Sequence, residues 1–124
     1  MKLHLLRILM IVFAGILVES PIAYADNMGA YSKVPLDQVC MVNNKYMAEN
    51  QIVVPYEGKT YYGCCDMCVE KLKGDPRART ATDPLTGESV DKASAFVVSK
   101  SDKKVLYFAS EENFQRFIAN VRGK

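Results

Sequence analysis

Four cysteines constrain what this chain can fold into more than any other feature of the sequence. Cys64, Cys65 and Cys68 lie within five consecutive positions, and Cys40 lies upstream of them. The only histidine, His4, stands near the N-terminus. A metal site in the rest of the chain would therefore use thiolate, thioether and oxygen ligands, without imidazole. Such ligands favour soft ions, with Cu(I) first and Zn(II) second.

Residues 1–25 are typical of a cleaved secretory signal peptide. A positively charged start precedes the apolar run 8–18, and Ala23-Tyr24-Ala25 forms a small-x-small cleavage pattern. The alternative is an uncleaved membrane anchor, but the run is shorter than the roughly 20 apolar residues that a span needs. We therefore expect an exported, periplasmic protein that has no membrane contact after cleavage.

Cleavage of 25 of the 124 residues would leave a chain of 99 residues with little net charge. Because Lys2, Arg7 and Glu19 would be removed, the net charge would fall from +2 to about +1. A nearly neutral chain without a basic stripe is a poor nucleic-acid binder, so we expect no nucleic-acid partner. A domain of this size has a thin core and often relies on disulfides or a metal ion, and four cysteines could supply either.

The predicted fold class is α+β, with two tandem units sharing one small core. After a flexible lead-in at 26–37, one domain is expected over 38–122, divided into a cysteine-bearing half at 38–75 and a cysteine-free half at 83–122. Each half shows two strand-like segments joined by a turn and followed by a helical pattern. The predicted elements are strands 51–56 and 59–62 with helix 64–73, and strands 95–99 and 104–108 with a helix that follows the N-cap Ser110.

The two halves align without gaps over twelve positions. Residues 61–72 lie over residues 106–117 at a constant offset of 45. We interpret the alignment as a duplicated hairpin-plus-helix unit whose second copy has lost its sulfur; coincidence between two short patterns is the alternative. In this alignment Cys64, Cys65 and Cys68 fall on Ala109, Ser110 and Asn113, and Cys40 falls on Thr86.

The spacing of the cysteines allows them to converge on one ion. On a helix, Cys64 and Cys68 would share a face, as would Cys65 and Cys68. A helix start also favours thiolate, and a folded hairpin could return Cys40 to it. Three sulfurs suit a trigonal Cu(I) site and four suit tetrahedral Zn(II). Met41, beside Cys40, is a possible auxiliary thioether ligand.

Two other uses of the cysteines stay open at this point. In an oxidising compartment the four thiols could pair into disulfides, with Cys40 joined to one of the other three. The Cys65-Asp66-Met67-Cys68 motif could also support thiol redox catalysis, although thioredoxin-like enzymes need a longer α/β unit than this chain offers. The expected mature chain has no Cys/His or Ser/His pair, so we expect no enzyme.

At these residues the chain resembles the TRASH domain, a module associated with heavy-metal trafficking, resistance and sensing. Cys40 followed by Cys64 and Cys68 after the aromatic strand end Tyr61-Tyr62-Gly63 matches its pattern. Residues 83–87 with 106–110 resemble the related YHS module without its cysteines, so that the resemblance covers about residues 38–120.

The resemblance implies a treble-clef-like finger that holds a metal ion. Exported relatives include the copper-delivery accessory proteins of nitrous oxide reductase, which also carry two such halves. We therefore expect a Cu(I) chaperone or buffer that acts in metal trafficking or resistance beside a copper enzyme or efflux protein. Cys40, Cys64 and Cys68 would be the primary ligands, and Cys65 a fourth or exchange ligand. The alternative is a disulfide-stabilised periplasmic interaction module that binds no metal.

Overall fold

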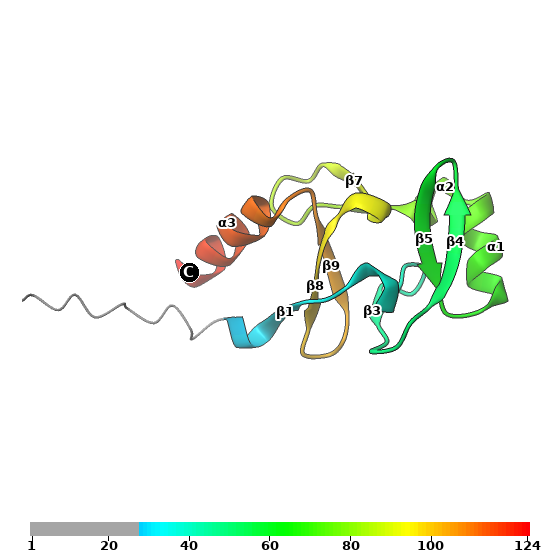
Figure 1. Cartoon of the computed structure of the whole chain (residues 1–124). Helices are drawn as coiled ribbons and strands as arrows, with labels where there is room; N and C mark the ends of the chain where they lie inside the picture. Colours follow the sequence, from blue (N-terminus) through cyan, green and yellow to red (C-terminus); the bar gives the residue numbers. More distant parts are fainter. Residues whose placement is uncertain (1–27) are drawn as a thin grey trace, which may run out of the picture.

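The computed structural model describes residues 28–124, an α+β arrangement of short antiparallel sheets and helices (Figure 1). The expected signal peptide, 1–25, lies outside the described residues. The elements are the 3₁₀ helices η1 (Met28–Ala30), η2 (Leu36–Gln38) and η3 (Lys92–Ser94), the strands β1 (Tyr31–Lys33), β2 (Val39–Cys40), β3 (Lys45–Tyr46), β4 (Ile52–Tyr56), β5 (Lys59–Gly63), β6 (Thr80–Thr82), β7 (Ser89–Asp91), β8 (Phe96–Lys100) and β9 (Val105–Phe108), and the helices α1 (Asp66–Gly74), α2 (Pro76–Arg79) and α3 (Glu111–Arg122).

The hairpin β4–β5 and the helix α1 form the centre of the first half. Glu57 and Gly58 connect the two strands with φ values of 49° and 75°, the left-handed conformation that tight hairpin turns require. Val54 and Tyr61 pair across the hairpin and are buried, and Leu72 of α1 belongs to the same core cluster. The predicted hairpin is confirmed, with β5 one residue longer than expected.

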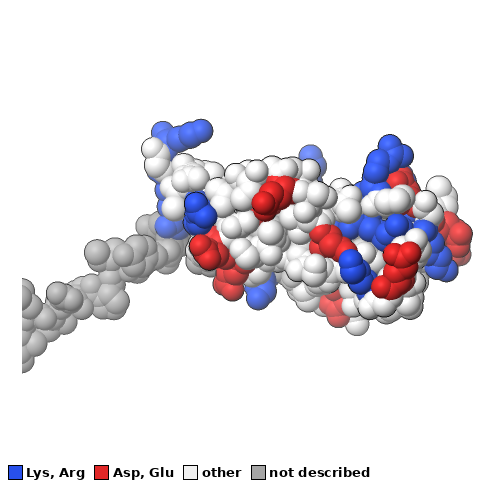
Figure 2. All heavy atoms as spheres, turned by 90° about the horizontal axis from the view of Figure 1, so that it is seen from above, with Lys and Arg blue, Asp and Glu red and all other residues white. Residues whose placement is uncertain are grey.

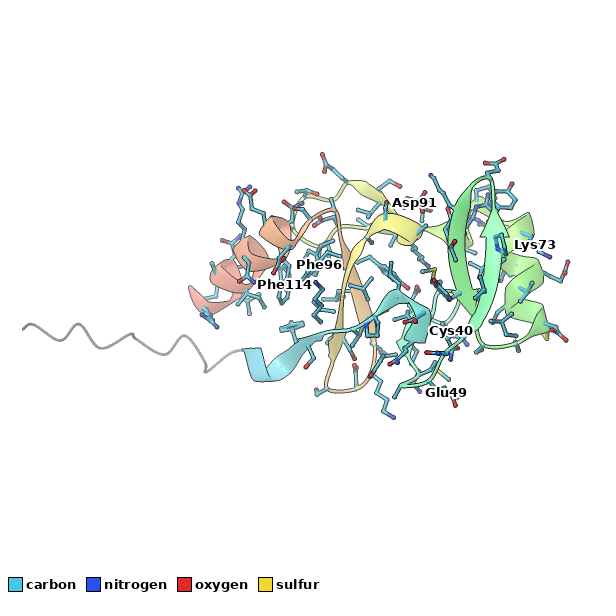
Figure 3. All side chains as sticks on the ribbon, in the orientation of Figure 1. Cys40, Glu49, Lys73, Asp91, Phe96 and Phe114 are labelled. Atoms are coloured by element: carbon cyan, nitrogen blue, oxygen red, sulfur yellow. The ribbon has the colours of Figure 1, made fainter. Side chains whose placement is uncertain are left out.

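The second half also contains a hairpin followed by a helix. β8 and β9 pair with each other, and β1 adds to the free edge of β8 to give the sheet order β1-β8-β9. The Ser110 side chain accepts a hydrogen bond from the backbone N–H of Asn113, which confirms the predicted N-cap. Phe114 and Ile118 of α3 pack with Phe108 of β9 in one buried cluster. Figure 3 shows Phe114 beside Phe96 of β8, which packs against this cluster.

The two halves share the larger of the two core clusters. It combines Val54 and Leu72 from the first half with Val97 and Tyr107 from the second. Backbone bonds also cross between the halves, since Asn44 accepts from the N–H of Val105. The larger cluster therefore contacts both hairpins, while a second cluster lies between the β8–β9 hairpin and α3.

Three local expectations differ from the structure. Part of the lead-in at 26–37 is ordered, because β1 pairs with β8 and η2 precedes β2. The linker after α1 is also structured, since it contains α2 and β6, and β6 pairs with β7. The helix expected at 64–73 begins at Asp66, because Cys65 is extended, with φ of −157°, and occupies the N-cap position.

No helix in residues 28–124 has both the length and the apolar character needed to cross a membrane. In the face shown in Figure 2, Lys and Arg side chains are intermixed with Asp and Glu side chains.

Asp83 ties the second half together. Its carboxylate is fully buried and accepts hydrogen bonds from the backbone N–H groups of Leu85, Thr86 and Ala109 and from the side-chain amide of Asn113. Burial alone would raise the pKa of Asp83, but these donors outweigh it and hold the pKa below its ordinary value. The carboxylate thus joins the β6–β7 turn to the start of α3.

We expect Asp83→Ala to lower the free energy of unfolding by about 3 kcal/mol, because it leaves several buried N–H groups without an acceptor. The loss should be largest at neutral pH and shrink as the pH falls through the folded-state pKa, which lies below the ordinary value near 4. Urea denaturation at several pH values measures both effects. Asp102→Ala, at a half-exposed turn, is the control and should cost less than about 1 kcal/mol. Equal losses in the two variants would contradict this role.

Candidate metal centre

The four cysteines come from two segments that meet at the start of α1. Cys40 ends β2, in the short β2–β3 hairpin that also provides Asn43. Cys64 follows β5 directly, Cys65 caps α1, and Cys68 lies in the first turn of that helix. Figure 3 shows Cys40 beside the β4–β5 hairpin. The predicted return of Cys40 to the start of the helix is confirmed.

Three of the sulfurs form a compact group. The Sγ atoms of Cys40, Cys64 and Cys68 all lie within 4.8 Å of one another. The Cys68 sulfur is central, 3.8 Å from that of Cys40 and 3.6 Å from that of Cys64. The Cys65 sulfur lies 3.5 Å from that of Cys68, outside the group of three. The side-chain amide of Asn43 donates to the Cys64 sulfur at 3.5 Å.

These separations match those of sulfur atoms around a single ion. With metal–sulfur bonds of about 2.3 Å, two ligands lie about 3.8 Å apart in a tetrahedral site and about 4.0 Å apart in a trigonal one. A disulfide would bring two sulfurs to about 2.05 Å, and all four cysteines are free in the structure. Cys40, Cys64 and Cys68 could therefore hold a metal ion with little movement of the backbone.

The β5 strand ends in a glycine because α1 approaches it closely. A Cβ atom added to Gly63 would lie 2.9 Å from the Cβ of Cys68 and 3.4 Å from the side chain of Leu72. Real Cβ atoms do not tolerate the shorter distance. Gly63 thus lets the first turn of α1 press against the hairpin, which carries the Cys68 sulfur toward that of Cys40.

The centre is half enclosed. Cys40 and Cys68 are buried, whereas Cys64 and Cys65 are exposed. An ion bound to the three grouped sulfurs would therefore be held from inside by two buried thiols and reached from outside through Cys64. The exposed Cys65, next to that opening, could take over or release a ligand position.

The protons are unevenly distributed among the four thiols. Burial would raise the pKa of Cys40, but backbone N–H groups led by that of Asn43 outweigh it, so the pKa is lowered. The backbone N–H of Cys68 is the main cause of the lowered pKa of Cys65. Hydrogen bonding with Cys40 raises the pKa of Cys64 to about 12, and burial raises that of Cys68. Negative charge thus favours Cys40 and Cys65, and an ion binding the group of three would displace protons from the others.

The structure places the candidate thioether in the core. Met41 is fully buried and belongs to the larger core cluster, which is the gap-filling position common for methionine. Met67, in the first turn of α1, is 82% exposed.

Asn43 and Lys92 contact the segments that carry the sulfurs, and neither was among the residues that the sequence singled out. Lys92 is buried and donates to the backbone carbonyl of Met41, next to Cys40. A single lysine or aspartate carries no pattern that marks it as buried. Only the neighbouring turn residues at 43–44 gave a signal, because asparagine pairs are common in tight turns.

No protein-family model matches the chain, and no curated protein or solved structure is similar enough to it to count as a match.

We expect Gly63→Ala to displace Cys68 and to weaken metal binding by about tenfold or more, because the added methyl group would overlap the Cys68 side chain. Gly74→Ala, at the end of the same helix, is the matched control, since nothing lies within 4 Å of its added Cβ. Competition with a chromophoric Cu(I) chelator measures the affinity of each variant. Tight binding by Gly63→Ala, equal to that of the control, would contradict the packing argument.

We expect Cys65 to be the first thiol to react with a limiting amount of iodoacetamide at pH 8. It is exposed and has a lowered pKa, whereas Cys64, which is also exposed, has its pKa raised to about 12. Fragmentation of the peptide that contains both residues, by mass spectrometry, locates the label. Preferential labelling of Cys64 would contradict the charge distribution.

Proposed function

We propose that this protein binds a soft metal ion, most favourably Cu(I) with Zn(II) as the alternative, and carries or buffers it outside the cytoplasm. One observation carries the proposal: the sulfurs of Cys40, Cys64 and Cys68 lie within 4.8 Å of one another although Cys40 is far from the others in sequence. Three sulfur ligands without imidazole favour Cu(I) over harder ions. The signal-peptide pattern of residues 1–25 supports a periplasmic location.

The arrangement of elements supports a treble-clef-like interpretation. In each half a short hairpin precedes a longer hairpin and then a helix, with β2–β3, β4–β5 and α1 in one half and β6–β7, β8–β9 and α3 in the other. This order agrees with the resemblance to TRASH and YHS modules. We propose that the two halves are tandem copies of one metal-finger unit, of which only the first retains sulfur ligands.

The hydrogen bonds of Asp83 support the duplication and revise the position equivalent to Cys40. Asp83 accepts from the N–H groups two and three residues further along, and the pKa of Cys40 is lowered by N–H groups at the same two offsets. The backbone of each residue also pairs with that of the residue five positions further along, Lys45 for Cys40 and Glu88 for Asp83. Asp83, rather than Thr86, therefore corresponds to Cys40. It bonds to Ala109 and Asn113, the positions that align with two of the other cysteines.

The exposed side of the centre fits a carrier. A carrier must release its ion to a partner, and exposed thiols allow a partner's ligands to replace them one at a time. We propose that Cys65 acts as the exchange ligand and that the recipient is a copper enzyme or an efflux protein.

Metal titration of single-cysteine variants tests the proposal. We expect the reduced wild-type chain to bind one Cu(I) tightly, and Cys40→Ser, Cys64→Ser and Cys68→Ser each to lower the affinity by about 100-fold or more, because each removes a thiolate ligand. Cys65→Ser is the matched control and should lose less than about tenfold. Elemental analysis after competition between Cu(I) and Zn(II) identifies the preferred ion.

Failure of the reduced wild-type chain to take up either ion, with two disulfides found by thiol titration after aerobic purification, would favour the disulfide-stabilised interaction module instead.

A further inference from the structure

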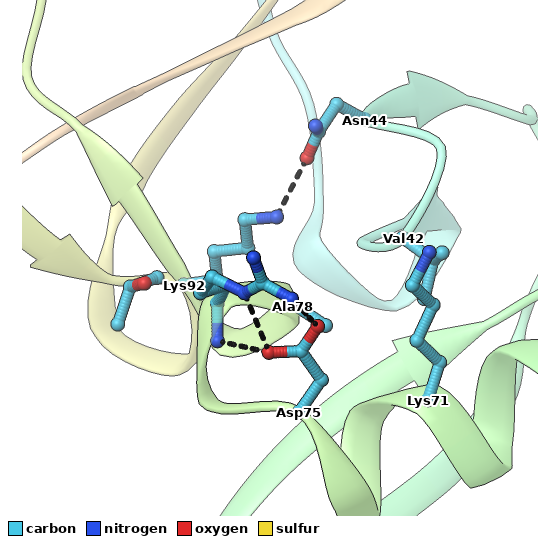
Figure 4. Close-up of a pocket in the computed structure, with 8 residues that line it drawn as sticks. Val42, Asn44, Lys71, Asp75, Ala78 and Lys92 are labelled. Carbon is cyan, nitrogen blue, oxygen red and sulfur yellow. Dashed lines mark hydrogen bonds and ion pairs between the residues drawn. The ribbon is translucent and has the colours of Figure 1, made fainter.

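Lys92 is a buried cation that the second half places behind the sulfur group. It belongs to η3 and is only 3% exposed. Its Nζ atom donates to the backbone carbonyl of Met41 at 2.7 Å and to the Oδ1 atom of Asn44 at 2.8 Å. Both acceptors lie in the β2–β3 hairpin segment that presents Cys40, and Figure 4 shows the bond to Asn44. The ammonium group is therefore fixed against the hairpin segment that begins at Cys40.

No carboxylate of the described residues balances this charge. The ion pairs in residues 28–124 join Lys59 to Asp91, Arg77 to Asp75 and Lys100 to Asp102, and none of them includes Lys92. Asp91, the neighbour of Lys92 in sequence, is turned toward Lys59 and Tyr61 instead. A buried ammonium without a counterion is costly, so its retention requires a compensating negative charge nearby.

The negative charge that acts on Lys92 comes from Cys40, next to the Met41 carbonyl that Lys92 binds. Burial lowers the pKa of Lys92 to about 8, and the only opposing contribution comes from the charge of Cys40. The same charge contributes to the raised pKa of Tyr107, whose ring lies 5.2 Å from the Lys92 Nζ atom. The charge of Cys40 thus raises the pKa of two buried side chains of the second half, and one of them, Lys92, is a cation.

We propose that the Lys92 ammonium is the fixed counter-cation of the metal–thiolate centre, so that the cysteine-free half contributes charge to the site of the other half. This inference rests on the proposed metal binding. A centre of three thiolates has a net charge of −2 with Cu(I) and of −1 with Zn(II). The positive charge of Lys92 reduces the magnitude of either net charge by one. Because the site is partly enclosed, a charge at this position acts more strongly than one in solvent. Lys92 is a positioning residue that does not itself contact the ion.

A purely structural role makes a different prediction for the metal-free protein. If Lys92 only ties the β2–β3 hairpin to η3, its loss should destabilise the metal-free chain, and binding should weaken only as far as folding does. If it is a counter-cation, its compensation is weaker in the metal-free chain, where the charge of Cys40 only partly offsets the cost of burying the ammonium group. An apolar replacement should then leave the metal-free chain about as stable, or more stable, while metal binding weakens.

The test compares Lys92→Met with Lys71→Met in the full chain. Met has nearly the same length as Lys and no charge. Lys71 lies on α1, three residues after Cys68, and lines the same cavity of about 410 Å³ as Lys92, but it is exposed (Figure 4). The comparison therefore separates a buried charge behind the sulfurs from a solvated charge near them.

We expect Lys92→Met to lower the Cu(I) affinity by about tenfold or more, measured by chelator competition, and Lys71→Met by less than about twofold. The thermal midpoint of metal-free Lys92→Met should stay within about 2 °C of wild type or rise. Lys92→Arg, which keeps the charge, should retain at least about a third of the affinity. Equal affinities of wild type and folded Lys92→Met, or an equal loss in folded Lys92→Arg, would overturn the inference.

Lys92→Met could unfold without metal, and the comparison of Lys92→Arg with Lys71→Met then decides the question. A folded Lys92→Arg variant with wild-type affinity supports the inference. A folded Lys92→Arg variant that has lost affinity overturns it. Failure of the wild-type chain to bind Cu(I) or Zn(II) would instead contradict the proposed function itself, so the two failures are distinguishable.

Discussion

The contact between the β2–β3 hairpin and the first turn of α1 is the constraint on which the site depends. It brings the Cys40 sulfur to 3.8 Å from that of Cys68, across 28 residues of chain. Free thiols contribute little to holding two segments together, because a sulfur–hydrogen donor is weak. The segments are instead positioned by packing: Gly63 admits α1 close to the hairpin, and the shared core fixes both. Packing therefore positions the sulfurs close together.

The two halves show two chemical solutions to one structural problem. In each half a short hairpin must be joined to the start of a helix that lies after a longer hairpin. The second half uses the Asp83 carboxylate, which accepts hydrogen bonds from both segments and needs no ligand. The first half places sulfurs at this junction, where they can be joined by an ion. A carboxylate gives a permanent connection, whereas thiolates give one that depends on metal and can be undone.

The second half supports the fold of the half that carries the cysteines. It contributes Val97 and Tyr107, among others, to the shared core. It also reaches into the first half through Asp91, which pairs with Lys59, and through Lys92, which bonds to the Met41 carbonyl. The first half is thereby held by contacts that do not involve its two exposed thiols.

The sequence alone determined the features that depend on neighbours in the chain. The turn at Glu57-Gly58, the N-cap Ser110 and the helix that follows it were predictable because each follows from local conformational preference. The available ligands followed from composition, since without a nearby histidine the four cysteines leave thiolate, thioether and oxygen. Tertiary structure alone decided that Cys65 stands apart from the other three sulfurs and that Lys92 and Asp83 are buried beside the two junctions. Those outcomes depend on contacts between residues far apart in the chain, and no local pattern encodes such contacts.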